Sequence, residues 1–171
     1  MNSRFAVLGS AAALAAGCAT QMPQTAEEFR KVAPGAFLMK QESFEVSRPL
    51  RDVAETLRRR APECLNMTVR TTSRTATSYQ VINTAYKATV VPGAERAELH
   101  LQRKHLTGVI RVHQEPEDGH YLMVVDAHRL ERNRTRIQAI GPSRGHDVLW
   151  RAIRGWAAGD NLGCPDMTKI G

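Results

Sequence analysis

Three cysteines offer the most specific chemistry in this chain of 171 residues. A thiol can act as a nucleophile that accepts a lipid group, form a disulfide or bind a metal ion. Cys64 and Cys164 stand far apart, and neither belongs to a Cys-x-x-Cys pair with metal-ligand spacing. Cys18 stands directly after a short apolar stretch near the amino terminus. The positions of the cysteines therefore point to two different uses of the thiol.

The amino terminus has the three parts of a secretory signal peptide. Arg4 supplies the basic residue, and residues 5–16 form an apolar stretch that is too short to cross a bilayer as a permanent helix. The following Leu14-Ala15-Ala16-Gly17-Cys18 resembles the bacterial lipobox, in which small residues precede the cysteine that receives diacylglycerol. The resemblance implies that residues 1–17 are removed and that acylated Cys18 becomes the first residue. An ordinary signal peptide with an incidental Cys18 is the alternative.

The lipid anchor determines the expected compartment. Ala19 follows Cys18 in place of the aspartate that such lipoproteins often use for retention in the inner membrane. The resemblance therefore implies the outer membrane of a Gram-negative cell, with the chain facing the periplasm and held stably by more than one acyl chain. In that oxidising compartment the two remaining cysteines, Cys64 and Cys164, are predicted to form a disulfide.

Composition predicts one domain that follows a linker. Residues 18–39 contain Pro23 and Pro34-Gly35, so we expect a flexible tether with one helical turn around residues 26–32. Residues 40–171 are enough for a single core. The formal net charge is +7. In the periplasm this charge favours an anionic envelope polymer, a lipid or an acidic envelope protein as the partner, and not nucleic acid. A solvated basic surface without a specific partner is the alternative.

The sequence favours a protein that is not an enzyme. Ser143 follows Gly141-Pro142 and precedes a predicted helix, and we interpret it as the N-cap of that helix rather than as a hydrolase nucleophile. His113 and His120 would lie roughly 13 Å apart in the expected hairpin, too far to share one zinc ion. We therefore expect no metal, no cofactor and no catalytic residue.

An arginine group is the one candidate for contact with an anion or a partner. The group lies around the expected turn between the last two strands and consists of Arg129, Arg132, Arg134 and Arg136. Guanidinium groups bind phosphate in a bidentate manner, so this loop could contact anionic head groups or an acidic protein. A solvated loop is the alternative.

Two amphipathic helices are predicted beside a run of strands. Residues 44–46 alternate as in a strand, and apolar residues at helical spacing between Leu50 and Ala61 then predict a helix that Pro62 ends. A second apolar stripe predicts a carboxy-terminal helix over residues 144–158, with Gly159 as its end. Between these helices the pattern has period two, as expected for strands.

The turn residues predict two hairpins and their registers. Pro92-Gly93 is expected to join two strands so that Tyr86 lies opposite Leu99 and Lys87 opposite Glu98. Asp118-Gly119 is a signal for a type I′ turn, in which both central residues need positive φ. This second hairpin would place Val112 and Ile110 opposite Val125 and Ala127.

The resulting fold class is α+β: an antiparallel meander of about six to seven strands, an early helix and a long carboxy-terminal helix. This element order resembles the helix-grip or START-like arrangement and the small helix-grip domains of the envelope lipoprotein BamC. The resemblance implies a binding or assembly accessory module of the cell envelope. It also leaves open a carrier that holds an apolar ligand or lipid in a cavity under the last helix. The residues able to line such a cavity are Tyr86, Leu99, Met123, Trp150 and Trp156.

Overall fold

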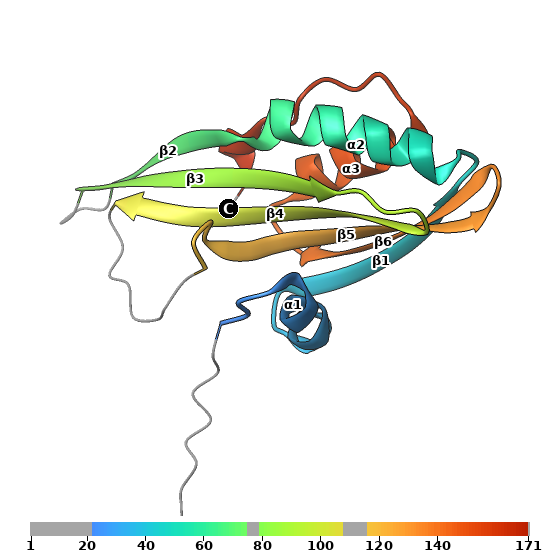
Figure 1. Ribbon diagram of the computed structural model, residues 1–171. Helices are drawn as coiled ribbons and strands as arrows, with labels where there is room; N and C mark the ends of the chain where they lie inside the picture. The colour runs from blue at the N-terminus through green and yellow to red at the C-terminus, as the bar shows by residue number, and fades with distance from the viewer. Residues whose placement is uncertain (1–21, 75–78, 108–115, 171) are drawn as a thin grey trace, which may run out of the picture.

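A computed structural model describes residues 22–74, 79–107 and 116–170 of the chain (Figure 1). The expected signal peptide, Cys18 and the strand expected around residues 109–113 lie outside the described residues. None of the described helices is long and apolar enough to cross a membrane.

The fold is α+β, as expected, and is built on one antiparallel sheet of six strands. The strands are β1 (Met39–Val46), β2 (Met67–Arg74), β3 (Tyr79–Val91), β4 (Arg96–Thr107), β5 (His120–Glu131) and β6 (Arg134–Pro142). Their order across the sheet is β1-β6-β5-β4-β3-β2, so the first strand pairs with the last.

Helices lie on both faces of this sheet (Figure 1). One face is covered by α2 (Leu50–Leu65) and α3 (Asp147–Ala158), and the opposite face by the short helix α1 (Ala26–Val32). Short 3-10 turns follow at Ala33–Gly35 and at Met167–Lys169. The main core lies between the sheet and the helix pair, where side chains such as Trp156 and Leu57 are fully buried.

Helix α2 is longer than the sequence predicts. Pro62 was expected to end it, but the helix continues to Leu65 with Pro62 inside its last turn. A proline there removes one backbone hydrogen bond. The extra turn buries Cys64 and Leu65 in the core, and the Pro62 carbonyl accepts a hydrogen bond from the Asn66 N–H. Burial of these two side chains therefore outweighs the lost hydrogen bond.

Helix α3 ends as predicted and begins later. Gly159 closes it with a φ of 91°, a conformation that favours glycine. The N-cap is His146, so the assignment of Ser143 to that position is wrong. The Ser143 N–H donates instead to the Leu38 carbonyl, 2.8 Å away, because the chain still follows the edge of the sheet there.

The β3–β4 hairpin forms, but its register is four residues away from the predicted one. Val91 lies opposite Glu98, and Tyr86 lies opposite Arg103 rather than Leu99. An even shift keeps every side chain on its expected face. The predicted Lys87–Glu98 pair is therefore wrong, and Lys87 bonds to Asp118.

The second predicted hairpin is wrong in its pairing. Strand β5 pairs with β4, so Leu99 and Ala97 take the places expected for Val112 and Ile110 opposite Val125 and Ala127. Gly119 does have a positive φ of 88°, whereas Asp118 does not, so the turn is not type I′. When an apolar strand could pair with either of two other strands, the turn that precedes it does not show which of the two it pairs with.

Part of the segment that we expected to be a tether is folded. The helical turn predicted around residues 26–32 is α1, and its apolar side packs on the sheet. Ala26, Phe29 and Ala33 are buried there against Val124 of β5 and Ile140 of β6. Thr25 caps the helix by accepting a hydrogen bond from the Glu28 N–H. The folded domain therefore includes residues before Lys40.

Candidate functional site

The predicted disulfide between Cys64 and Cys164 is confirmed. Their Cα atoms lie 5.0 Å apart, and the bond spans 100 residues of sequence. It joins the end of α2 to the segment that follows α3. The bond therefore holds the carboxy-terminal segment against the helix layer.

The arginine group lies around the β5–β6 turn, but it does not form one surface. Arg129 lies opposite Thr135 in the register, on the helix-covered face, where it lines a cavity with α2. Arg134 and Arg136 alternate with Thr135 and so point to the other face. Arg132 lines a shallow cavity beside Arg51.

Carboxylates of the same chain neutralise most of this group. The pairs are Arg129 with Glu95 at 3.1 Å, Arg134 with Glu131 at 2.7 Å, and Arg136 with Glu45 at 3.1 Å. These pairs are partly exposed, which makes each of them weak. That an anion or a partner contacts this group stays a prediction for Arg129, Arg132, Arg134 and Arg136. The ion pairs lower the expected strength of that contact.

The residues expected to line a carrier cavity lie in packed surroundings. Leu99, Met123, Trp150 and Trp156 are at most 2% exposed and belong to the main core, and Tyr86 packs against it. Five surface cavities of the described residues are lined by other side chains. This packing gives no support to a carrier.

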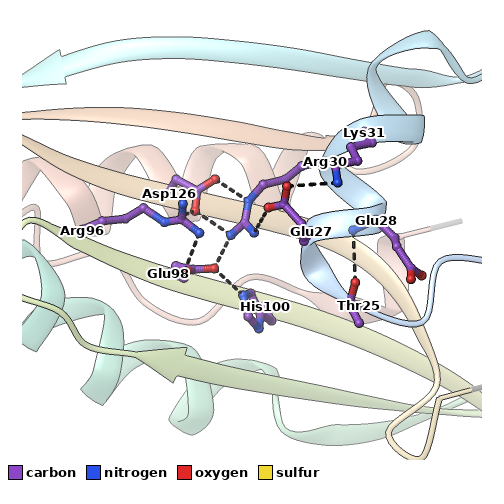
Figure 2. Close-up of polar contacts among 9 residues, drawn as sticks. All are labelled: Thr25, Glu27, Glu28, Arg30, Lys31, Arg96, Glu98, His100 and Asp126. Atoms are coloured by element: carbon purple, nitrogen blue, oxygen red, sulfur yellow. Dashed lines mark hydrogen bonds and ion pairs between the residues drawn. The ribbon is translucent and has the colours of Figure 1, made fainter.

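The densest polar cluster of the described residues lies between α1 and the sheet (Figure 2). Arg30 of α1 donates two hydrogen bonds to the Asp126 carboxylate, at 2.9 and 2.7 Å, and one to Glu98. Arg96 binds the same two carboxylates from β4, at 2.5 Å from Glu98 and 3.3 Å from Asp126. The Nε2 atom of His100 lies 2.9 Å from Glu98. Two arginines therefore share two carboxylates.

The cluster strongly favours the charged form of Glu98. Burial alone would raise the pKa of this carboxyl, but hydrogen bonds from His100, Arg30 and Arg96 outweigh burial and lower the pKa to about 2. Burial likewise opposes the charge of Arg30, while Asp126 and Glu98 raise its pKa above the usual value. We call this cluster of Arg30, Arg96, Glu98, His100 and Asp126 the clamp, because it holds α1 against the sheet. Its charged side chains are all paired with one another.

The sequence analysis missed this clamp because its parts are far apart in the chain. Arg30 stands 96 residues before Asp126 and 68 residues before Glu98. One local signal was available: Glu98 and Asp126 alternate with buried apolar residues in β4 and β5, the central strands of the sheet. Carboxylates at such positions need a cationic partner on the same face.

A cavity of about 480 Å³ lies beside α1, near the start of β1. Its apolar lining consists of Phe37, Leu38, Met39, Tyr121, Leu122 and Pro142. Tyr121 connects it to α1, because the rings of Phe29 and Tyr121 have centroids 5.9 Å apart. Tyr121 therefore connects the cavity to α1, whereas the clamp residues Glu98 and Asp126 lie farther along the same two strands, β4 and β5.

The rim of this cavity is an exposed apolar turn. The Met39 N–H donates to the Ala36 carbonyl at 3.2 Å, which closes a four-residue turn around Phe37 and Leu38. Phe37 is 91% exposed and Leu38 is 43% exposed. Leu38 has a φ of 62°, a left-handed conformation that costs a residue other than glycine about 1–2 kcal/mol. Strain and exposure of this kind gather at functional sites.

Three polar side chains complete the cavity: Arg103, Arg144 and His146. The described part of the chain provides no carboxylate within ion-pair distance of either arginine. His146 is 6% exposed, and its Nδ1 atom lies 2.7 Å from the Arg144 carbonyl, so Nδ1 carries the proton. Its buried Nε2 atom has no hydrogen-bond partner in the described structure. Burial lowers the pKa of His146, so the ring is neutral at pH 7.

Ser143 belongs to a sequence whose spacing matches a hydrolase motif. Residues 141–145 read Gly-Pro-Ser-Arg-Gly, from the last two residues of β6 into the loop before α3. A nucleophile elbow holds its serine in a strained turn. Leu38 is the one residue other than glycine with positive φ in the described ranges, so Ser143 is not held in that way. The described residues as a whole contain no group of three or more His, Cys, Asp or Glu side chains placed to bind a metal.

Comparisons with known proteins identify no family. No protein-family model matches the sequence, and no curated protein sequence matches it. The crystal structure of protein MLL2253 from Mesorhizobium loti is similar over 70% of this chain and 95% of MLL2253, with 13% sequence identity and a TM-score of 0.31. A likeness of this size supports no inference about function.

Proposed function

We propose that this chain is the precursor of an outer-membrane lipoprotein, anchored through acylated Cys18 and facing the periplasm. The domain that follows is a non-enzymatic binding or assembly accessory module of the Gram-negative envelope. Its partner is an envelope protein, or an anionic envelope polymer or lipid. No cofactor and no nucleic acid take part.

The pairing of the cysteines is the observation that carries this proposal. The chain has three cysteines, and Cys64 and Cys164 are bonded to each other. A structural disulfide is typical of an exported protein. Cys18 is the remaining cysteine, and it stands at the end of the lipobox-like sequence. Acylation of Cys18, the cysteine outside the disulfide, agrees with export to the periplasm.

The polar side chains support a binding role. The acidic residues of the densest cluster are engaged with arginines in the clamp, which leaves them no role as general acid or base. At the cavity beside Phe37, by contrast, two arginines without a carboxylate partner among the described residues, Arg103 and Arg144, lie beside exposed apolar side chains. Exposed apolar side chains with a polar rim are typical of surfaces that contact a protein or a membrane.

The test is acylation in living bacteria. The chain is produced in a Gram-negative host with an alkyne-tagged fatty acid, and the label on the protein is measured beside its Cys18→Ser variant. We expect label in the unchanged chain, none in the variant, and recovery of the labelled protein with outer-membrane fractions. An Ala19→Asp variant should keep the label and move to the inner membrane. Unlabelled protein in the soluble periplasmic fraction would overturn the proposal.

A further inference from the structure

We propose that the turn at Phe37 and Leu38, with Arg103 and Arg144 beside it, is the surface by which the domain rests on the phospholipid bilayer that holds its anchor. This inference rests on acylation at Cys18. It assigns an orientation to the anchored domain, and it names anionic phospholipid as the chemistry that this end of the molecule contacts.

The apolar part of the surface has the shape that an interfacial contact needs. Phe37 projects from a tight turn with 91% of its surface exposed, beside Leu38 at 43%. An aromatic and an aliphatic side chain at a turn tip enter the boundary between head groups and acyl chains without backbone rearrangement. The strained φ of Leu38 maintains that projection at a cost in stability.

The charged part has the sign that lipid phosphates attract. Arg103 and Arg144 line the cavity next to the turn, without an ion-pair partner among the described residues. Three arginines at the opposite end of the sheet, Arg129, Arg134 and Arg136, are by contrast paired with carboxylates. Each basic side chain near an anionic bilayer contributes about 1 kcal/mol of attraction. Two cations without a carboxylate partner among the described residues, Arg103 and Arg144, thus lie beside the exposed apolar turn.

The length of the chain before the domain brings this surface close to the bilayer. Met22, the first described residue, follows Cys18 by four residues, so their Cα atoms lie at most about 14 Å apart. The chain then enters α1, which the Arg30 clamp fastens to the sheet (Figure 2). Phe29 of α1 contacts Tyr121, which lines the cavity. An anchor at Cys18 therefore keeps close to the membrane the side of the domain that carries α1, which is the face of the sheet opposite α2 and α3 in Figure 1.

The experiment reports membrane contact from residue 37 itself. Trp150 and Trp156 are 2% and 0% exposed, so the native tryptophans are shielded from quenchers. A Phe37→Trp variant adds one exposed indole at the proposed contact. A Val91→Trp variant is the matched control, because Val91 is 45% exposed and lies at the opposite end of the sheet. The acylated proteins are placed in vesicles of phosphatidylcholine with brominated chains, with and without phosphatidylglycerol.

We expect brominated chains to remove most of the added emission of the Phe37→Trp variant and none of that of Val91→Trp. The loss should be larger when phosphatidylglycerol is present. Replacing Arg103 and Arg144 with glutamine in the Phe37→Trp variant should shift the contact equilibrium about thirtyfold toward the unquenched state. The Phe37→Trp variant should also become protected from aqueous iodide when vesicles are added.

Each other outcome overturns the inference. Acylated protein in which neither variant is quenched, or in which both are quenched equally, leaves the proposed function intact and rejects this surface. Protection of the Phe37→Trp variant from iodide before vesicles are added shows that a soluble ligand or protein occupies the cavity instead. A mature chain without an acyl group rejects the inference together with the proposed function.

Discussion

Replacement of Glu98 by glutamine should remove a defined part of the acid sensitivity of the protein. The folded protein holds the pKa of Glu98 at about 2, against an ordinary value of 4.5. A difference of this size corresponds to at most about 3.5 kcal/mol of folding free energy, since each pKa unit is worth about 1.4 kcal/mol. The side chain is 20% exposed, so solvent screening is moderate and the full value is an upper bound.

The sign of the pH dependence follows from the direction of the shift. Because the pKa is lower in the folded state, the unfolded state takes up the proton first as the pH falls. The stabilisation by Glu98 is therefore fully present above a pH of about 4.5 and is lost as the pH falls toward about 2. Other carboxylates with lowered pKa values, such as Glu42, add their own losses in both proteins.

The assay is urea unfolding, followed by the fluorescence of the buried tryptophans, at a series of pH values between neutral and strongly acidic. The difference in unfolding free energy between the unchanged protein and Glu98→Gln should approach about 3 kcal/mol at neutral pH and shrink in acid. Glu27→Gln is the matched control: Glu27 lies at the edge of the same cluster but is 62% exposed, so it should cost under about 0.5 kcal/mol. A difference for Glu98→Gln that stays constant with pH would refute the reasoning.

Three further changes test the fold around the site. Arg30→Ala should lower the free energy of unfolding by about 3 kcal/mol and make the chain before β1 sensitive to protease. The control is Lys31→Ala, whose side chain is 70% exposed and which should lower that free energy by under about 0.5 kcal/mol. Equal effects of the two changes would contradict the clamp. Replacement of Cys64 and Cys164 by alanine should lower the unfolding free energy by about 2–5 kcal/mol, and an unchanged urea midpoint would count against a structural disulfide. Leu38→Gly should be more stable than Leu38→Ala by about 1 kcal/mol, because only glycine relieves the positive φ; the reverse order would show that the turn is unstrained.

The element order was predictable because its signals are local. Apolar residues at helical spacing marked α2 and α3, and Gly159 marked the end of α3 through its own conformational freedom. The disulfide followed from counting cysteines within an expected oxidising compartment. Each of these inferences used residues that lie close together in the chain, or a property of the chain as a whole.

Strand register and the clamp were not predictable because their determinants are distant. Glu98 suggested a cross-strand pair with Lys87, but its main partner is Arg30 on a helix that we expected to be tether. Val125 had two apolar candidates, Val112 and Leu99, and the turn at Gly119 could not choose between them. A local pattern shows which face a side chain takes, but not which element covers that face.

The cavity was missed for a related reason. Phe37 and Leu38 stand at the end of the expected tether, and Arg103 and Arg144 come from a strand and a loop that the sequence does not join. One signal was available: an apolar run over residues 36–39 directly after Pro34-Gly35 is unusual in a polar linker. Such a run marks either a buried strand or a surface that contacts something else.

The mass of the amino-terminal peptide of the mature protein tests the central claim most directly. The protein is purified in detergent from the membranes of a Gram-negative host and digested, and the first peptide is measured by mass spectrometry. The account predicts that this peptide begins at Cys18 and carries diacylglycerol and an added acyl chain. A peptide that begins elsewhere and contains Cys18 with an unmodified thiol would contradict it.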